Sequence, residues 1–258
     1  MLLTGATGGI GEAIARALDA KGARVLISGR RADQLERISA ELGGRPAVLA
    51  ADLAERGAVI DLAARAGAVD VLVANAALPA SGPIDDFTAE EIDRALDVNL
   101  RAPIQLTRAL LPGMVDRGAG HVVLMSSLSG RVASVGSSLY SATKFGLRGF
   151  AAGVREDLHG SGVGVTVVYP GFVSGAGMFA DAGVRLPKGV GTRSPEQVAA
   201  AVVAGIERGK AEIDVAPLSL RAGTFLSSLA PTTASRIQRR LGSARLSHAI
   251  AEGQKPKR

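Results

Sequence analysis

The stretch Thr4–Gly11 reads TGATGGIG and joins a short apolar run to a helix-forming segment. Met1–Leu3 precede it, and the amphipathic segment Glu12–Ala20 follows it. Glycine lets the backbone turn sharply and lets other groups approach it closely, because it has no Cβ atom. The order of strand, glycine turn and helix predicts the start of a β-α-β unit, although Met1–Leu3 would make an unusually short first strand.

Apolar runs rich in Val, Ile and Leu alternate with amphipathic stretches over most of the remaining chain. Long helical patterns cover Thr88–Met114 and Ser138–His159. Near-continuous apolar strands separated by helices indicate a parallel sheet that is buried on both faces. We therefore predict an α/β fold with a doubly wound, Rossmann-type parallel sheet of about seven strands and helices on both faces. Further strands are expected at Arg24–Ser28, Pro46–Ala50, Val69–Ala74, His121–Ser126, Val163–Tyr169 and Glu212–Ala216.

No linker interrupts this alternation before Pro217. We expect residues 1–216 to form one sheet domain and residues 217–258 to form a C-terminal helical extension with a basic tail. The net charge of +6 comes from this tail, since residues 236–258 contain seven Lys or Arg and one Glu. A charged end of this kind is usually solvated; the alternative is contact with anionic lipid or a partner protein.

Composition excludes several other kinds of protein. The rest of the chain is neutral and aromatic residues make up 3% of the sequence, which argues against a nucleic-acid partner. The chain has no Cys, so disulfides and thiolate metal sites are excluded. His121, His159 and His248 are scattered, so no metal site is expected. No apolar run approaches the roughly 18 residues that span a bilayer, and no signal peptide is visible, so we expect a cytoplasmic protein.

The glycines of the opening stretch follow the pattern Gly5-x3-Gly9-x-Gly11, directly before a helix. A helix N-terminus favours the negative charge of a pyrophosphate, and glycines allow the backbone to approach it. At the head of a β-α-β unit, the turn predicts a dinucleotide cofactor. The alternative is a glycine turn that only ends a strand.

The end of the second strand indicates which dinucleotide is bound. A free adenosine ribose usually meets an acidic residue there, but this chain has Ser28, Arg30 and Arg31, with no carboxylate before Asp33. A guanidinium group suits a 2′-phosphate because it is planar and permanently charged. We therefore expect NADP(H) rather than NAD, unless Arg30 and Arg31 only begin a solvated helix.

Tyr140 and Lys144 lie four residues apart in LYSATKFGL, Leu139–Leu147. On a helix they would share one face. Taken alone, the pair fits a surface contact between a ring and a solvated charge. An ammonium group close to a phenol can instead lower the phenol pKa from about 10 towards neutral pH, which would prepare the phenol for proton transfer.

Together, these segments resemble the short-chain dehydrogenases/reductases, in the single-domain subgroup, over about Leu2–Ala216. The similar motifs occur in the same order as in the family. They are TGATGGIG, Asp52-Leu53, ANAA at Ala74–Ala77, VNLRAP at Val98–Pro103, MSSLSG at Met125–Gly130, YSATK at Tyr140–Lys144 and YPGFV at Tyr169–Val173.

The resemblance implies a catalytic tetrad of Asn99, Ser127, Tyr140 and Lys144, with Ser126 as the alternative to Ser127. It also implies that the cofactor contacts the strand ends and the helix that carries Tyr140. The cofactor-binding residues expected in this way are Gly5, Thr7, Gly9, Ile10, Gly11, Ser28, Arg30, Arg31, Asp52, Leu53, Asn75, Ala76, Tyr140, Lys144, Pro170, Gly171 and Val173.

Two parts of the chain depart from the family pattern. Ala74 and Ala77 replace an Asn and a Gly of the family's NNAG, and Gly175 replaces the usual Thr after the Pro-Gly segment. We therefore expect Ser174 or the backbone of Val173 to anchor the carboxamide of the cofactor.

The resemblance implies an NADP(H)-dependent oxidoreductase that interconverts a ketone and a secondary alcohol, with Tyr140 as general acid/base. Residues 1–216 would then be the catalytic, NADP-binding domain. Apolar side chains in the Gly-rich segment Ser174–Thr192 favour an apolar substrate beneath a mobile lid, or they only pack the fold. The alternatives are a non-catalytic NADP-binding regulatory protein and an assembly or membrane-surface role led by the tail from Leu218. By resemblance, a homodimer or homotetramer is expected.

Overall fold

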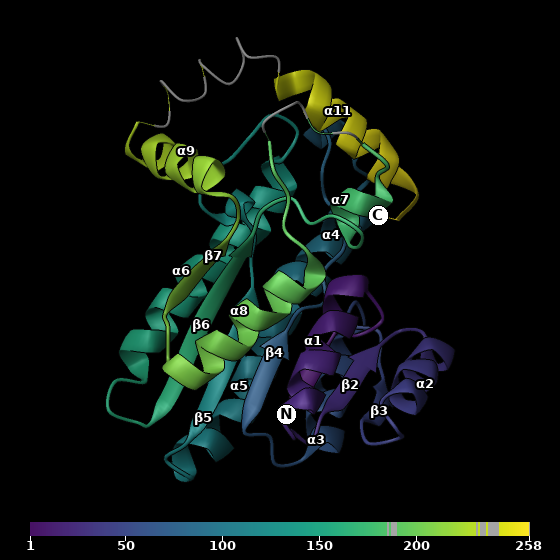
Figure 1. Ribbon diagram of the computed structural model, residues 1–258, viewed down its shortest axis with the longest axis vertical. Coiled ribbons are helices and arrows are strands. Elements are labelled where there is room, and N and C mark those ends of the chain that lie inside the picture. The colour runs from purple at the N-terminus through teal and green to yellow at the C-terminus, as the bar shows by residue number, and fades with distance from the viewer. Residues whose placement is uncertain (185, 187–189, 231, 233–235, 237–242, 258) are drawn as a thin grey trace.

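A seven-stranded parallel sheet, with strand order β3-β2-β1-β4-β5-β6-β7, forms the centre of the structure (Figure 1). The structure is a computed structural model and describes residues 1–184, 186, 190–230, 232, 236 and 243–257. The predicted doubly wound sheet is confirmed, and its strands begin and end within a residue or two of the predicted runs. They are β1 (Leu2–Thr4), β2 (Leu26–Gly29), β3 (Ala47–Ala50), β4 (Val71–Ala74), β5 (Gly120–Met125), β6 (Val163–Pro170) and β7 (Glu212–Val215).

Helices cover both faces of the sheet because the strands point apolar side chains to both sides. In β1, Leu2 packs with one set of helices, α3, α5 and α6, whereas Leu3 packs with the other set, α1, α2 and α8. Both leucines are fully buried. The helices are α1 (Gly9–Ala20), α2 (Ala32–Glu41), α3 (Arg56–Ala66), α5 (Ala102–Asp116), α6 (Ser138–Asp157) and α8 (Pro195–Arg208).

Strand β1 is short but lies in the middle of the sheet, paired with β2 on one side and β4 on the other. The chain runs outwards from β1 to β3 and then returns past β1 to β4. In sheets of this type the ligand crevice lies at such a change of direction, outside the carboxyl ends of the strands, which here are β1 and β4. The glycine turn leaves β1 at this crevice.

The helical pattern over Thr88–Met114 is divided into two helices. Thr88 caps α4 (Ala89–Leu96) through reciprocal hydrogen bonds with Glu91. A π-helical turn over Asp97–Arg101 then leads into α5. Such wide turns often occur at functional sites, and this one carries Asn99. The sequence pattern did not indicate the break.

Among the residues that the structure describes, two α-helices follow β7 at the carboxyl end of the sheet (Figure 1). The first, α9 (Leu218–Leu229), has no buried residue. The second, α11 (Ser243–Gln254), lies against the short helix α7 (Met178–Asp181), where the Gln254 side chain donates a 3.2 Å hydrogen bond to the Met178 carbonyl. None of the helices in the described ranges is long and apolar enough to cross a membrane.

Candidate active site

The glycine turn is folded tightly against the end of β4. Gly5 has a φ of 67°, and a Cβ atom there would lie 2.7 Å from Cα of Ala76. A Cβ atom on Gly11 would lie 2.1 Å from the Gly5 carbonyl oxygen. Only glycine fits these two positions. Because the N-cap residue Gly8 gives no side-chain hydrogen bond to the first turn of α1, the backbone N–H groups of that turn suit a pyrophosphate.

Asn75 connects the glycine turn to β4. Its side-chain amide donates hydrogen bonds to the carbonyl oxygens of Thr4 at 3.2 Å and Gly5 at 3.1 Å. The Thr4 hydroxyl in turn accepts hydrogen bonds from the backbone N–H groups of Asn75 and Ala76. Ala74, where the family has Asn, is buried in the hydrophobic core. The remaining Asn of the ANAA segment is therefore sufficient to tie the two strand ends together.

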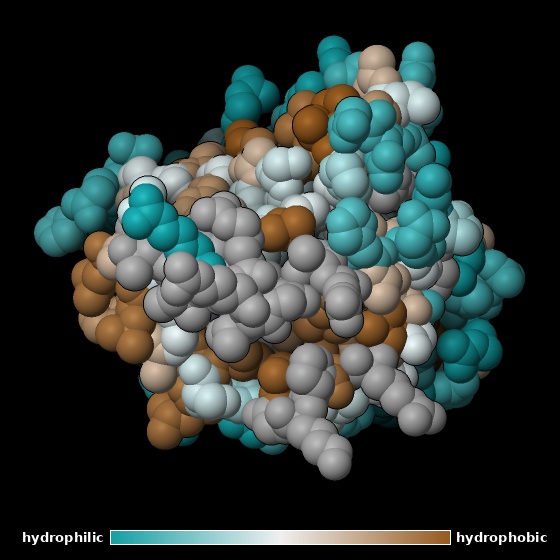
Figure 2. All heavy atoms as spheres, turned by 90° about the horizontal axis from the view of Figure 1, so that it is seen from above, coloured by the Kyte–Doolittle hydropathy of each residue, from teal (hydrophilic) through white to brown (hydrophobic). Residues whose placement is uncertain are grey.

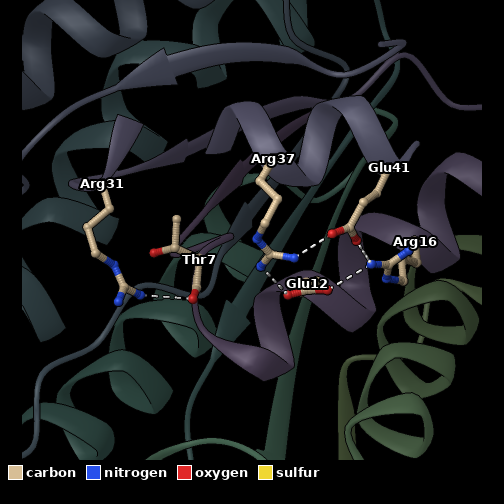
Figure 3. Close-up of polar contacts among 6 residues, drawn as sticks. All are labelled: Thr7, Glu12, Arg16, Arg31, Arg37 and Glu41. Carbon is tan, nitrogen blue, oxygen red and sulfur yellow. Dashed lines mark hydrogen bonds and ion pairs between the residues drawn. The ribbon is translucent and has the colours of Figure 1, made fainter. Parts of the chain in front are cut away.

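The end of β2 presents a buried hydroxyl and two exposed guanidinium groups. The Ser28 hydroxyl is buried and has no hydrogen-bond partner among the described residues. Arg31 donates a 3.0 Å hydrogen bond to the carbonyl of Thr7 in the glycine turn (Figure 3). Arg30 is exposed and makes no hydrogen bond or ion pair within the part of the chain that the structure describes. The region therefore offers positive charge beside the turn.

Two neighbouring arginines are already paired with carboxylates. Arg16 and Arg37 each contact both Glu12 and Glu41, so that α1 and α2 are joined by a four-residue network (Figure 3). These side chains are partly exposed, so solvent screens the pairs and each contributes little to stability. Arg30 and Arg31, by contrast, have no carboxylate partner in the described ranges.

Asp52 and Leu53 follow β3 at the same edge of the sheet. One carboxylate oxygen of Asp52 accepts a 3.0 Å hydrogen bond from the backbone N–H of Ala54, which fixes the loop. Leu53 is buried and packs into the core on the α3 side. The pair thus lies at the sheet edge where the resemblance places the adenine, with the carboxylate of Asp52 partly buried.

Ser127, Tyr140 and Lys144 come together beyond the carboxyl end of β5. Ser127 caps the 3₁₀ turn η3 (Leu128–Gly130), and its hydroxyl lies 3.5 Å from the Pro170 carbonyl oxygen. The same hydroxyl is close enough to the phenol of Tyr140 on α6 to lower the pKa of that phenol. Lys144 lies one turn further along α6, with its Nζ atom 5.5 Å from the centre of the Tyr140 ring. The same Nζ atom donates a 2.9 Å hydrogen bond to the Met125 carbonyl. The structure thus joins three of the four expected catalytic side chains.

Ser126 points away from Tyr140. Its buried hydroxyl donates a 3.0 Å hydrogen bond to the backbone carbonyl of Lys144. Gly130 makes this approach possible, because a Cβ atom there would lie 2.3 Å from the Ser126 oxygen and 2.7 Å from the Lys144 carbonyl oxygen. Ser126 therefore holds η3 against α6, and Ser127 is the serine that reaches the phenol.

Burial changes the acid–base properties of both α6 side chains in the protein alone. It raises the pKa of Tyr140 to about 12, against the smaller, opposite effect of the nearby Ser127 hydroxyl. It also lowers the pKa of Lys144 to about 8. The prediction that Lys144 makes Tyr140 more acidic applies to the complex with the cofactor. In the protein alone the loss of water around the phenol dominates, and the Lys144 nitrogen lies 5.5 Å from the ring centre.

Asn99 contacts the loop after β4 rather than the other three side chains. Its side-chain oxygen accepts a 2.6 Å hydrogen bond from the Leu78 N–H, and its side-chain nitrogen donates a 2.9 Å hydrogen bond to the Leu78 carbonyl. Asn99 is fully buried. Its amide therefore clamps one residue of the loop through both backbone groups, a contact that the sequence did not predict.

The segment after β6 lies on the glycine turn. Val173 is buried and forms an isolated parallel bridge with Arg193, and the Ser174 N–H donates a 2.9 Å hydrogen bond to the Arg193 carbonyl. Further along, a Cβ atom on Gly9 would lie 2.3 Å from the Cβ of Ala176. Pro170, Gly171 and Val173 are thus held at the crevice, while residues 185 and 187–189 of the expected lid lie outside the described residues.

One polar cluster near the site could not be found from the sequence. Arg131, just after η3, places its guanidinium 3.8 Å from the centre of the buried Tyr169 ring. It also pairs with Asp214 at 2.7 Å and Glu212 at 3.0 Å, and the Tyr169 hydroxyl donates a 2.8 Å hydrogen bond to Glu212. These residues come from three separate segments, and no spacing in the sequence relates them. They fix the loop that carries Ser127 to β6 and β7.

No group of His, Asp or Glu that could hold a metal ion occurs among the described residues. His121 is buried, and its Nε2 atom lies 2.8 Å from the Thr166 hydroxyl. Burial lowers the pKa of His121. This histidine therefore has a structural contact at the amino-terminal end of β5, away from the crevice.

Comparison with known proteins supports the resemblance that the motifs suggested. Residues 1–184 match the family model described as short chain dehydrogenase. Ketoacyl reductase HetN of Nostoc sp. is 35% identical over 254 residues, which cover 94% of this chain and 88% of that protein. The NADP-dependent 3-hydroxy acid dehydrogenase YdfG of Escherichia coli (strain K12) is 37% identical over 180 residues, which cover 68% of this chain and 73% of that protein.

Solved structures show the same fold. A short-chain dehydrogenase from Streptomyces avermitilis has a TM-score of 0.78 at 27% identity, covering 94% of this chain and 96% of that chain. The closed form of a serine dehydrogenase complexed with NADP+ has a TM-score of 0.76 at 32% identity, covering 84% of this chain and 94% of that chain. With its sheet order, its motifs and most of its length shared in this way, the chain belongs to the short-chain dehydrogenase/reductase family.

Proposed function

We propose that the protein is an NADP(H)-dependent oxidoreductase that interconverts a ketone and a secondary alcohol on an apolar substrate. One observation carries the proposal: Ser127 lies close to the Tyr140 hydroxyl, and the Lys144 ammonium nitrogen lies 5.5 Å from the centre of the Tyr140 ring. A phenol, a hydroxyl donor and a cation at the carboxyl ends of parallel strands form a site for proton transfer to an oxygen atom.

The residues at the crevice fit a dinucleotide with a 2′-phosphate. The uncapped first turn of α1 supplies N–H groups for the pyrophosphate. Arg30 and Arg31, without carboxylate partners in the described ranges, supply positive charge for the phosphate at the adenosine end. One relative and one solved structure described above have NADP in their names, which supports NADP(H) as the cofactor of this chain. Asp52, Leu53, Asn75 and Ala76 would line the adenosine side, and Pro170, Gly171, Val173 and Lys144 the nicotinamide side.

In the proposed reaction, the bound cofactor supplies or accepts the hydride. Tyr140 donates its phenolic proton to the carbonyl oxygen in the direction of reduction, and it takes the proton back in the direction of oxidation. Ser127 donates a hydrogen bond to the same oxygen, where negative charge develops. At neutral pH the raised pKa keeps Tyr140 protonated, which is the form that reduction needs.

Lys144 would place a positive charge beside the phenol of Tyr140, whereas the neighbouring Ser127 is uncharged. Burial lowers the Lys144 pKa to about 8, so that the amine gains or loses a proton easily near neutral pH. Asn99 holds the Leu78 backbone beside the site. By resemblance, it also completes a water-linked path for the proton.

The substrate is proposed to be apolar because of the side chains around the segment after β6. The rings of Phe172 and Phe179 lie 4.9 Å apart, at an angle of 56°, and Met178 begins the neighbouring helix α7. The relatives include a ketoacyl reductase and a 3-hydroxy acid dehydrogenase. Acyl compounds with an oxygen at the third carbon are therefore the first substrates to test.

The test is a spectrophotometric screen of 3-ketoacyl compounds, 3-hydroxy acids and simple ketones with NADPH and with NADH. Turnover with NADPH in the wild type, and its loss by a factor of about 100 or more in Tyr140→Phe, is the expected result. The variant should bind NADPH as the wild type does in a fluorescence titration. Ordinary turnover in Tyr140→Phe would overturn the assignment of the acid. NADPH binding with no turnover of any compound would favour the non-catalytic, regulatory alternative.

We propose residues 1–216 as the catalytic domain of a homodimer or homotetramer that acts in the cytoplasm. A groove along α5 and α6, lined by Ile104, Leu111, Val115 and Phe150, supports self-association through these helices. Light scattering after size-exclusion chromatography tests it: a multiple of the 26.2 kDa chain mass is expected, and a monomer would contradict the proposal.

A further inference from the structure

Helix α9 turns its apolar side chains away from the rest of the molecule. Leu218, Ala222, Phe225 and Leu229 follow each other at intervals of three and four residues and so share one face, with Leu226 beside them. Leu218 is 75% exposed, Phe225 and Leu226 are each 65% exposed, and Leu229 is 69% exposed. In Figure 2, hydrophobic side chains gather on the left, which is the side of α9 in Figure 1.

The opposite side of α9 is the one that is partly covered by the protein. Its partly buried residues are Leu220, Thr224 and Ser227. The Thr224 hydroxyl donates its hydrogen bond to the Leu220 carbonyl within the same helix. An amphipathic helix on a globular protein normally packs its apolar face inwards. α9 does the reverse, so its apolar stripe is not used for the core of this chain within the described residues.

The chain beyond this helix is strongly basic. Residues 236–258 contain seven Lys or Arg and one Glu, and Arg221 adds a cation on α9 itself. The remainder of the protein carries no net positive charge. An exposed apolar helix face and a nearby polybasic segment are the two signals that together hold a protein at an anionic lipid surface. An apolar protein partner would explain the helix but would not require the charge.

We propose that α9 lies flat in the headgroup region of an anionic bilayer, with the basic C-terminal segment contacting lipid phosphates. Twelve residues make a helix about 18 Å long, which suits a position in the interface plane. α9 begins shortly after β7, at the carboxyl end of the sheet (Figure 1). The membrane would therefore lie on the same end of the molecule as the crevice. The proposal rests on α9 and the tail, not on the proposed reaction.

The experiment is co-sedimentation of the full chain with vesicles of phosphatidylcholine alone and of phosphatidylcholine mixed with phosphatidylglycerol. The wild type should sediment with the mixed vesicles and remain largely in solution with phosphatidylcholine. Raising the salt from about 0.1 M to about 1 M should release a large part of the bound protein, because the Debye length falls from about 10 Å to about 3 Å.

Two variants separate the apolar face from the charge. Phe225→Ser with Leu229→Ser keeps the charge and should weaken partitioning by at least about tenfold, because two large side chains no longer enter the lipid. Arg239→Gln with Arg240→Gln keeps the face and should weaken binding to mixed vesicles only. The matched control is Ile60→Ser, an exposed isoleucine on α3 that is 62% exposed, and it should bind as the wild type does.

Each outcome decides the proposal. The proposal is overturned if the wild-type protein stays in solution with both kinds of vesicle, or if the Phe225/Leu229 double variant binds vesicles as well as the wild type does. If the wild type does not bind vesicles, and the double variant elutes as a smaller species than the wild type on size-exclusion chromatography, the face binds a second copy of the chain instead. Circular dichroism melting controls for folding, because surface replacements should leave Tm within a few degrees of the wild type. Turnover of the soluble enzyme should be the same in all variants, so a failed membrane test leaves the proposed reaction untouched.

Discussion

The ammonium nitrogen of Lys144 lies 5.5 Å from the centre of the Tyr140 ring and is hydrogen-bonded to the Met125 carbonyl. Burial lowers the pKa of Lys144 from 10.5 to about 8. The unfolded chain therefore binds more protons than the native protein between about pH 8 and pH 10.5, and native stability rises with pH over this window. Below pH 8 the full cost of the buried charge, about 3 kcal/mol, is present.

The first prediction concerns Lys144→Met. The free energy of unfolding of the wild type should increase, relative to that of Lys144→Met, by about 2 kcal/mol between pH 7 and pH 10. Urea titrations of both proteins over this range measure the difference. The comparison ends at pH 10, because burial raises the pKa of Tyr140 to about 12 and gives a slope of the opposite sign above pH 10. A constant difference between the two proteins would contradict the lowered Lys144 pKa.

The second prediction separates the two arginines at the end of β2. Arg30→Ala should raise the Kd for NADPH by about tenfold or more and leave that for NADH almost unchanged, because a charge-assisted contact to the 2′-phosphate is lost. Arg31→Ala should weaken both cofactors, since it also removes the hydrogen bond that ties Arg31 to Thr7 in the glycine turn.

The matched control for these variants is Arg37→Ala. Arg37 forms ion pairs with Glu12 and Glu41 (Figure 3). Its replacement should therefore leave the ratio of the Kd for NADPH to the Kd for NADH unchanged. Fluorescence titration with each cofactor measures all three variants. Equal weakening of NADPH and NADH binding by Arg30→Ala would remove the argument for a 2′-phosphate contact.

The third prediction concerns Asn99→Ala. The change leaves the buried N–H and carbonyl of Leu78 without the partners that Asn99 provides, which should lower the free energy of unfolding by about 2–4 kcal/mol. Thr88→Ala removes a helix cap at an exposed position and should cost about 1 kcal/mol. Denaturant unfolding compares the two. A smaller loss for Asn99→Ala than for Thr88→Ala would show that the clamp contributes little.

The fourth prediction concerns Arg131→Ala. Arg131 is largely buried between Tyr169, Glu212 and Asp214, so its removal should lower the free energy of unfolding by about 2–4 kcal/mol. Because the cluster holds the loop after Ser127, the same variant should lower kcat more than it changes the Kd for NADPH.

Arg148→Ala is the control for this cluster. The Arg148 guanidinium lies 3.5 Å from Glu212, a longer contact than those of Arg131, and the Arg148 side chain is more exposed. Replacing it should therefore lower the free energy of unfolding by less than about 1 kcal/mol. Equal stability losses for the two arginine variants would contradict the structural role of Arg131.

The sheet and much of the crevice could be predicted from the sequence because their signals are local. The glycine turn, the apolar strands and the four-residue interval between Tyr140 and Lys144 each lie within a short stretch of chain. The parallel sheet then determines which strand ends meet. The contact of Asn99 with Leu78, by contrast, depends on how a helix lies against a loop 21 residues away.

Other features depend on tertiary contacts that no local pattern reports. The Arg131 cluster joins three segments separated by as many as 83 residues. The raised pKa of Tyr140 results from burial, which the four-residue interval does not reveal. The orientation of α9 is also a property of the folded molecule, since the sequence shows that the helix is amphipathic but not which face it turns outwards.

Gly9 and Ala176 lie so close together that a Cβ atom on Gly9 would overlap the Ala176 side chain. Any larger residue at position 9 would therefore push the chain after β6 away from the glycine turn. That chain leads into α7, to which α11 is attached through Gln254 and Met178. The absence of a single side chain at position 9 thus lets the first helix, the chain after β6 and the C-terminal helix pack as one unit.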